Sequence, residues 1–123
     1  MVIVDTSIWI DHFRAGNPAL ESLLLEADVA VHPFVLGELA CGGITRTSTI
    51  FSYLRELPEA PLIDQQEFYP FVENNTLSGA GIGFVDVHLL ASARVASMFL
   101  WTFDKKLMNC ALTLKVAYKS HGM

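Results

Sequence analysis

Residues 2–7 read Val-Ile-Val-Asp-Thr-Ser, an apolar β-branched run that stops at an acid. Consecutive apolar residues with branched Cβ atoms are typical of a strand that is covered on both faces in a parallel sheet. Thr6 and Ser7 can cap the amino end of a helix, which we expect to continue through Phe13. A buried strand that leads directly into a helix predicts a βαβ unit, with the carboxylate of Asp5 at the junction.

The same alternation of strand and helix patterns continues along the rest of the chain, without a repeat or a linker-like stretch. It indicates an α/β fold, a three-layer sandwich with helices on both faces of a parallel sheet, and a single domain over residues 1–123. Further strands are predicted at 29–31, 62–63, 99–101 and 114–118. Further helices are predicted at about 19–26, 33–42, 45–57, 65–77, 85–96 and 105–111.

The composition excludes several classes of protein. Hydrophobic residues make up 52% and charged residues 17% of the 123, which excludes a disordered chain and suits a large core. No apolar run approaches the roughly 18–20 residues that span a bilayer, and no basic region precedes the first apolar stretch as in a signal peptide. Cys41 and Cys110 stand alone, as is typical of reduced cytosolic thiols. We therefore expect a cytoplasmic protein without a membrane segment.

Four acids stand where an apolar pattern ends or a buried helix is predicted: Asp5, Glu38, Asp86 and Asp104. Asp5 and Asp104 lie just past predicted strands, at the edge where ligands bind in open α/β sheets. Asp86 falls in the first turn of a helix, where the helix dipole favours negative charge. Capping or helix-end electrostatics could explain each of these three alone. Together, the four predict a fold that gathers carboxylates around a divalent metal ion, because desolvated carboxylates need a positive partner.

Glu38 is the acid that is hardest to explain as a helix cap, because it falls inside a predicted helix. Its neighbours at i−4, i−3 and i+3 are Phe34, Val35 and Cys41, so helical periodicity predicts that Glu38 shares the apolar face and points inward. Burying a glutamate without a partner is unfavourable, and no basic residue lies near it in the sequence. We therefore expect Glu38 to join the other acids.

The donor chemistry favours Mg²⁺ or Mn²⁺, because carboxylate oxygens are hard ligands. Mg²⁺ usually engages substrate phosphates, and a pair of such ions can promote phosphodiester hydrolysis. A zinc site is not expected, since the four histidines do not fall at ligand spacing with the cysteines. Thr102 lies two residues before Asp104, so a strand would place both on one face and let the hydroxyl support the acids. Glycines at 79, 81 and 83 would allow the backbone approach that brings Asp86 into the site.

The net charge of −5 is unusual for a nucleic-acid-binding protein, which normally shows a basic surface. Without the four acids, nine acidic residues face eight basic ones, so one or two divalent ions would offset most of the excess. The acidity therefore does not exclude a nucleic-acid substrate. Lys105 and Lys106, beside Asp104, and Arg14 are weak candidates for RNA binding, and a solvated helix start is the alternative explanation for the two lysines.

The four acids occur in short motifs that together resemble a PIN domain, especially those of VapC-type toxins. The opening Val-Ile-Val-Asp5-Thr-Ser-Ile-Trp-Ile resembles the start of that domain. Pro-Phe-Val-Leu-Gly-Glu38-Leu matches the second acid of the family, Gly-Ile-Gly-Phe-Val-Asp86 its glycine-led third motif, and Thr-Phe-Asp104-Lys-Lys-Leu its fourth. Any one motif is weak, but four in order span essentially the whole chain.

This resemblance implies a parallel sheet of about five strands and an endoribonuclease that depends on Mg²⁺ or Mn²⁺. It also implies the toxin half of a toxin–antitoxin pair, commonly a homodimer, which an antitoxin protein neutralises by laying its carboxyl-terminal segment across the active site. The family cleaves structured RNA, frequently transfer RNA or a ribosomal RNA loop. The implied catalytic and metal-binding residues are Asp5, Glu38, Asp86 and Asp104, with Thr6, Ser7 and Thr102 in support.

Three alternatives remain open at this point. A receiver domain shares the length, fold class and acidic Mg²⁺ site, but would have an acid pair after the first strand, where this chain has Asp5 alone. A phosphatase of the haloacid-dehalogenase type would have Asp-x-Asp there, where this chain has Asp5-Thr6-Ser7. A PIN-like fold kept only as a non-catalytic binding module is also possible, although such a scaffold has no need of four clustered carboxylates.

Overall fold

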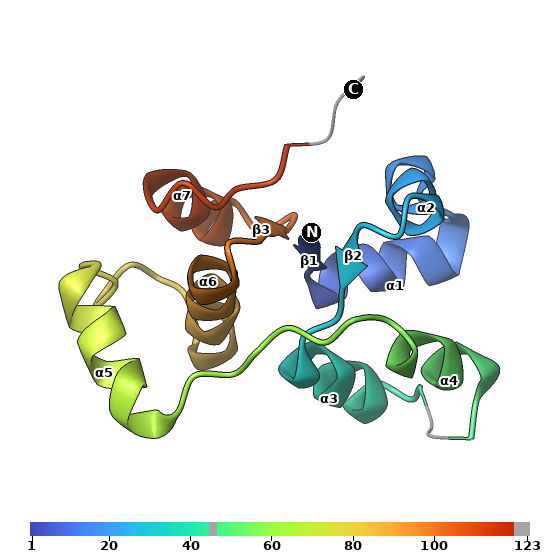
Figure 1. Cartoon of the computed structure of the whole chain (residues 1–123), viewed down its shortest axis with the longest axis horizontal. Coiled ribbons are helices and arrows are strands. Elements are labelled where there is room, and N and C mark those ends of the chain that lie inside the picture. Colours follow the sequence, from blue (N-terminus) through green and yellow to red (C-terminus); the bar gives the residue numbers. More distant parts are fainter. Residues whose placement is uncertain (45–46, 120–123) are drawn as a thin grey trace.

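The computed structural model describes residues 1–44 and 47–119. At its centre is a parallel sheet in which β1 (Val2–Val4) lies between β2 (Val29–Ala30) and β3 (Phe99–Trp101), as Figure 1 shows. β1 pairs in parallel with both neighbours and is buried along its whole length, as expected for a β-branched run in the middle of a parallel sheet. The α/β fold class predicted from the sequence is confirmed.

Helices fill most of the remaining chain. The described residues contain α1 (Thr6–Ala15), α2 (Pro18–Leu25), α3 (Pro33–Cys41), α4 (Thr49–Arg55), α5 (Gln65–Asn74), α6 (Phe84–Ala96) and α7 (Lys105–Thr113). In Figure 1, α2 and α7 lie above the strands, whereas α3, α4 and α6 lie below them. α6 packs against β3, α5 and α7, and α1 packs against α3. No helix in these described ranges is both long and apolar enough to cross a bilayer.

The prediction of about five strands is wrong, because the described residues contain three. The strand expected at 62–63 is replaced by a single parallel bridge between Val31 and Glu59. Pairing there consists of two hydrogen bonds of 2.8 Å, from the N–H of Val31 to the carbonyl of Pro58 and from the N–H of Ala60 to the carbonyl of Val31. Pro58 and Pro61 have no N–H to donate, so this edge cannot extend into a regular strand.

The strand expected at 114–118 is likewise reduced to a single bridge, between Leu100 and Ala117. Leu100 donates to the carbonyl of Val116 at 2.6 Å and accepts from the N–H of Tyr118 at 2.9 Å. Lys115 has a φ of 63°, a left-handed conformation that turns the chain after α7 and leaves too few extended residues for a ladder. Both outer segments therefore lie beside the sheet but pair with it at one position each.

The seven predicted helices form, but most of their ends differ from the predictions by one or more residues. Asp5, rather than Thr6 or Ser7, is the N-cap of α1, because its carboxylate accepts the first free N–H of the helix. α4 begins at Thr49, not at 45, with Ser48 as its N-cap; residues 45 and 46 lie outside the described ranges. α5 continues through Pro70 and ends at Asn74 instead of 77.

Two histidines are buried, His32 as the N-cap of α3 and His88 within α6. The Nδ1 atom of His32 accepts the N–H of Phe34 at 3.0 Å, so the ring proton lies on Nε2 and is donated to Ser92 Oγ, also at 3.0 Å. Burial and, as the smaller cause, the neighbouring His88 together lower the pKa of His32 to about 4. The pKa of His88 is lowered by burial among three aromatic rings, with centroids 4.6–4.9 Å away, which belong to Phe34, Phe68 and Phe84.

Candidate functional site

Asp5 lies at the carboxyl end of β1, where the strand passes into α1. Its backbone N–H donates to the carbonyl of Trp101 in β3 at 2.9 Å, which fixes the residue at this edge of the sheet. Both side-chain oxygens are held: Oδ1 accepts the N–H of Thr6 at 2.8 Å, and Oδ2 accepts the hydroxyl of Thr102 at 2.7 Å. Thr6, just past the end of β1, and Thr102, just past the end of β3, therefore orient the carboxylate of Asp5.

The pKa of Asp5 shows which other acids are near it. Burial raises this pKa above its usual value, and the hydrogen bonds from Thr102 and Thr6 act in the opposite direction. The negative charges of Asp86 and Glu38 raise it further. Three of the four acids predicted from the sequence are thus brought within electrostatic range of one another.

Thr102 connects the first acid to the last. It is only 3% exposed, and its hydroxyl donates to Asp5 while accepting the backbone N–H of Asp104 at 3.0 Å. One buried hydroxyl therefore sets the relative positions of two acids that are 99 residues apart in the numbering. A strand threonine at this position can do so because it is the first residue beyond β3, opposite the end of β1.

Glu38 is exposed, so the prediction that it points inward is wrong. The residues of α3 that face the core are Val35 and Leu39, which leaves Glu38 on the flank of the helix. Its Oε1 accepts the hydroxyl of Thr6 at 2.6 Å, across the contact between α3 and α1. The resemblance placed Thr6 in a supporting role, but no sequence spacing predicts this contact between residues 32 positions apart.

Asp86 and Asp104 both act as helix caps. Asp86 is partly buried in the first turn of α6, and its Oδ2 accepts the N–H of Gly83 at 3.0 Å. Asp104 is exposed and is the N-cap of α7, where its Oδ1 accepts the N–H of Leu107 at 2.9 Å. Capping uses one oxygen of each carboxylate. The second oxygen accepts no hydrogen bond from the described residues, so it is open to a ligand.

No basic side chain neutralises these acids in the part of the chain that the structure describes. The ion pair that the described residues form lies away from these acids. It joins the amino terminus to Asp28 at 3.3 Å, at the amino end of β1. Asp104 and Asp86 also raise the pKa of Cys110 in α7, after burial as the main cause, so their charge extends over that thiol. A partly desolvated, unpaired set of carboxylates is electrostatically unfavourable and is relieved by a bound cation.

The donor set fits Mg²⁺ or Mn²⁺ in its chemistry, since it offers carboxylate oxygens with unneutralised charge. Among the described residues, however, no three His, Cys, Asp or Glu side chains converge closely enough to hold a metal ion together. Direct ligation by all four acids is therefore not the arrangement seen. Mg²⁺ in proteins usually binds one or two carboxylates and keeps several waters as its other ligands. These residues can provide such a site.

The other residues predicted for the site are all exposed. Ser7 is exposed, as are Lys105 and Lys106 in the first turn of α7. Arg14 is exposed on α1 and borders a hollow of about 440 Å³ that also reaches Glu38. The remaining lining of this hollow is mostly apolar: Ile10, Phe13, Leu39, Gly42 and Ile44.

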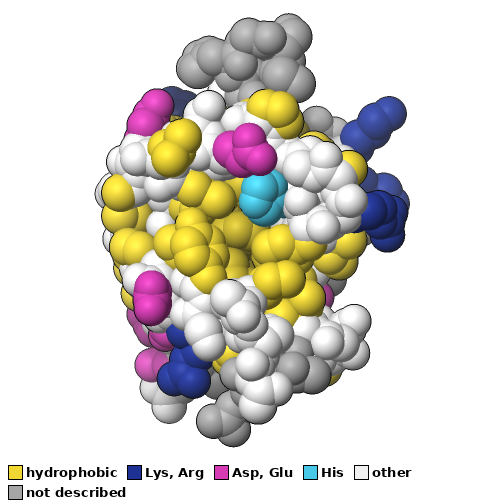
Figure 2. All heavy atoms as spheres, turned by 90° about the vertical axis from the view of Figure 1, so that its right-hand side faces the viewer, with side chains coloured by type: hydrophobic (Ala, Val, Ile, Leu, Met, Phe, Trp, Pro, Cys, Tyr) yellow, Lys and Arg dark blue, Asp and Glu magenta, His cyan; other side chains and the backbone are white. Residues whose placement is uncertain are grey.

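A broad apolar surface covers the side of the molecule that carries α1 to α4. Figure 2 shows apolar side chains as a continuous area in the middle of this face, with acidic and basic side chains at its margins. Exposed apolar residues on these helices are Ile10, Leu25, Ile50 and Tyr53. Such a surface is suited to a protein partner more than to the phosphates of a nucleic acid.

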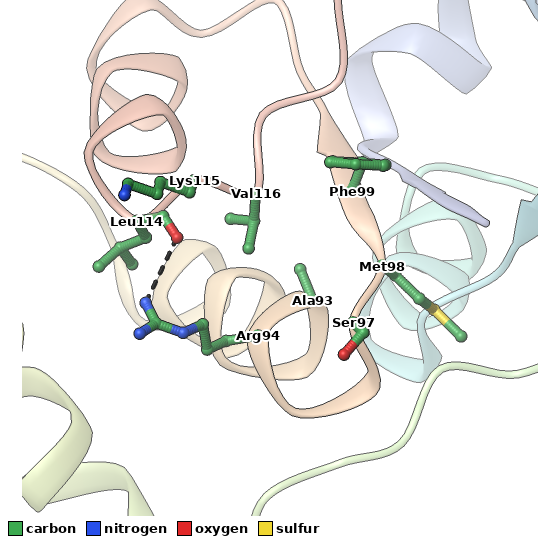
Figure 3. A pocket seen from close by; sticks show the side chains of 8 residues that line it. All are labelled: Ala93, Arg94, Ser97, Met98, Phe99, Leu114, Lys115 and Val116. Atoms are coloured by element: carbon green, nitrogen blue, oxygen red, sulfur yellow. Dashed lines mark hydrogen bonds between the residues drawn. The ribbon is translucent and has the colours of Figure 1, made fainter.

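A separate pocket lies at the opposite edge of the sheet from the acids. A pocket of about 370 Å³ is found at the start of β3, with Arg94 from α6 and Lys115 after α7 in its wall. Figure 3 shows the guanidinium of Arg94 against the carbonyl of Leu114, to which it donates at 3.3 Å. This pocket contains none of the predicted site residues, so it is separate from the carboxylate site.

Comparison with known proteins supports the VapC-type family that the motifs resemble. No protein-family model matches the chain. Ribonuclease VapC32 of Mycobacterium tuberculosis, from strain CDC 1551 / Oshkosh and from strain ATCC 25618 / H37Rv, is in each case 40% identical to it over 108 residues. The aligned region covers 87% of this chain and 87% of the relative. The chain belongs to the VapC ribonuclease family.

Proposed function

We propose that this protein is the toxin of a VapBC-type toxin–antitoxin pair, a metal-dependent endoribonuclease whose PIN domain spans residues 1–123. It hydrolyses RNA phosphodiester bonds in an active site formed by Asp5, Glu38, Asp86 and Asp104. The observation that carries this proposal is the carboxylate of Asp5 at the carboxyl edge of the sheet. Two hydrogen bonds orient it, no basic side chain among residues 1–44 and 47–119 neutralises it, and the charges of Asp86 and Glu38 raise its pKa. The 40% identity to Ribonuclease VapC32 supports it.

Asp5, Asp86 and Asp104 would hold Mg²⁺ or Mn²⁺, directly or through water. Once bound, such an ion stabilises negative charge on the phosphate and lowers the pKa of a bound water. Thr102 keeps Asp5 and the start of α7 in a fixed relation, and Thr6 holds one oxygen of Glu38. The other oxygen of Glu38 is left to orient the attacking water or to accept its proton.

The partners of the proposed toxin are an RNA substrate, an antitoxin and a second copy of the chain. Transfer RNA or a ribosomal RNA loop is the substrate class that the family resemblance favours, and the cytoplasm is where such RNA is met. The apolar hollow beside Glu38 supports an antitoxin segment that enters next to the site, because its walls are apolar and one side reaches a proposed catalytic acid. Arg14 borders the same hollow.

The proposed activity is tested by incubating the purified protein with transfer RNA in Mg²⁺, in Mn²⁺ and in EDTA. We expect discrete cleavage products with either metal and intact RNA in EDTA. A receiver domain would leave the RNA intact and take a phosphoryl group from acetyl phosphate, and a phosphatase would hydrolyse p-nitrophenyl phosphate instead. A binding module would shift the RNA in a gel without cutting it. Any of these three results would reject the nuclease.

Metal binding should also stabilise the fold. At a metal concentration ten times its dissociation constant, a single site raises the free energy of unfolding by about 1.4 kcal/mol, or roughly 5 °C in melting temperature. Differential scanning fluorimetry with a Mg²⁺ and Mn²⁺ series, with K⁺ at matched ionic strength as the control, measures this shift. A melting temperature that does not respond to either metal at millimolar concentration would contradict the proposed site.

A further inference from the structure

The side chain of Lys106 lies across the glycine-rich loop that precedes α6. A Cβ atom on Gly81 would lie 2.9 Å from Cδ of Lys106, closer than Cβ atoms approach other atoms, and 3.1 Å from its Nζ, which is tighter than most such contacts. Gly81 also has a φ of 82°, a conformation that favours glycine. The absence of a side chain at residue 81 therefore leaves room for the side chain of Lys106. This side chain extends from α7, which Asp104 caps, to the loop that leads to Asp86.

The position of Lys106 is not explained by the stability of the fold. It lies in the first turn of α7, where the helix dipole repels a cation, and that turn contains no acidic residue. Its ammonium makes no ion pair with any carboxylate in the described ranges. A cation kept at the unfavourable end of a helix, beside unneutralised acids yet not paired with them, is available to a ligand with negative charge.

We propose that Lys106 binds a phosphate of the RNA substrate next to the cleaved bond, and that Gly81 is its positioning residue. This inference rests on the proposed function, because it takes RNA as the ligand. An ammonium on a flexible stem binds a phosphate oxygen as a compact charge. It would let an acidic surface admit a polyanion at the one place where cleavage requires it. Lys105 is the adjacent cation in the same turn, and Gly81 makes its close approach to Lys106 rather than to Lys105.

Two matched pairs of variants test the proposal. Lys106→Gln is compared with Lys115→Gln, which removes the same charge from an exposed lysine at the opposite edge of the sheet from the acids. Gly81→Ala is compared with Gly79→Ala, because Gly79 has a similar φ of 75° but no atom within 4 Å of an added Cβ. Both alanine variants carry the same backbone strain, so their melting temperatures should fall equally. Only Gly81→Ala should displace the lysine, since the atoms it meets are the flexible end of that side chain.

The measurement is the binding of a fluorescein-labelled RNA hairpin in EDTA, where no metal-dependent cleavage occurs, over a series of KCl concentrations. We expect Lys106→Gln to weaken binding by roughly tenfold and to reduce the slope of log K against log[KCl] by about 0.7, as for one lost contact to a single-stranded phosphate. Gly81→Ala should give the same two changes. Lys115→Gln and Gly79→Ala should stay within about twofold of the wild type.

The outcomes separate this inference from the proposed function. Equal effects of Lys106→Gln and Lys115→Gln, or an RNA affinity and salt slope that neither variant changes, would overturn the role of Lys106 even in a protein that cleaves RNA with Mg²⁺. Wild-type protein that does not bind the hairpin at all would overturn it as well. Selective loss of binding in Lys106→Gln and Gly81→Ala supports the role of Lys106, even when the wild type fails to cleave in the metal assay and the nuclease is rejected.

Discussion

Replacing Asp5 by asparagine is expected to lower the rate of RNA cleavage by roughly a thousandfold while the protein stays folded. Asparagine keeps the shape of the side chain and can still accept the N–H of Thr6, so α1 retains its cap. It removes the negative charge that would attract the metal ion. Single-turnover cleavage of transfer RNA in saturating Mg²⁺, with circular dichroism as the check on folding, measures the effect.

Asp28→Asn is the matched control, because Asp28 lies at the other end of β1 and pairs with the amino terminus. It should retain the wild-type cleavage rate. Cleavage by Asp5→Asn at more than about a tenth of the wild-type rate would rule out Asp5 as a metal-binding residue.

The same variant should be at least as stable as the wild type in EDTA. Since the folded-state pKa of Asp5 is raised above 3.8, the folded protein binds this proton more tightly than the unfolded chain. Ionised Asp5 therefore destabilises the metal-free protein at neutral pH, and the penalty fades as pH falls through the raised pKa. Asparagine removes the penalty at all pH values, so the melting temperatures of the two proteins should converge in acid.

The second large effect is a loss of stability in acid that depends on His32. Its pKa is about 4 in the folded protein against 6.5 for the free side chain, so the unfolded chain binds the proton more tightly between these values. Stability is therefore lost as pH falls from 6.5 towards 4, by about 3 kcal/mol at pH 4. The cause is structural: Nδ1 already accepts the N–H of Phe34, and a proton there would break that bond inside the core.

Urea unfolding of the wild type and of His32→Asn at pH 7, 5.5 and 4 tests this expectation. Asparagine can still cap α3 but does not titrate, so the variant should be less stable at pH 7 and should lose less stability on acidification. Carboxylates and His88, whose pKa is also lowered by burial, act in both proteins, and the difference between the two isolates His32. Parallel pH profiles would show that His32 is not the group responsible.

The centre of the sheet could be predicted from the sequence, but its edges could not. β1 and β3 are short runs of residues with strong strand preference, and both form as expected. The two outer segments do not form regular strands, for reasons that lie in their local sequence and conformation. Pro58 and Pro61 are visible in the sequence and should have lowered the expectation of a strand beside them. The left-handed conformation of Lys115 leaves no such sign, because lysine has no preference for it.

The site could be predicted as a set of residues, but not as an arrangement. The strand-end positions of Asp5 and Asp104 follow from parallel topology, and the structure places Thr102 between them. The orientation of Glu38 does not follow from periodicity, because periodicity describes one helix and not the helix packed against it. The contact of Glu38 with Thr6 and that of Lys106 with Gly81 both depend on how separate elements meet, which no single-segment pattern contains.

The hydrogen bond between Thr102 and Asp5 has a consequence for the order of events during translation. A ribosome releases the chain from its amino end, so β1 and β2 are free to pair long before β3 exists. Asp5 can meet Thr102 only after 97 further residues have been synthesised, and Asp104 follows later still. A nascent chain therefore lacks the assembled carboxylate site until Thr102 and Asp104 have left the ribosome, and the ribosome that makes the proposed nuclease is not exposed to its activity before then.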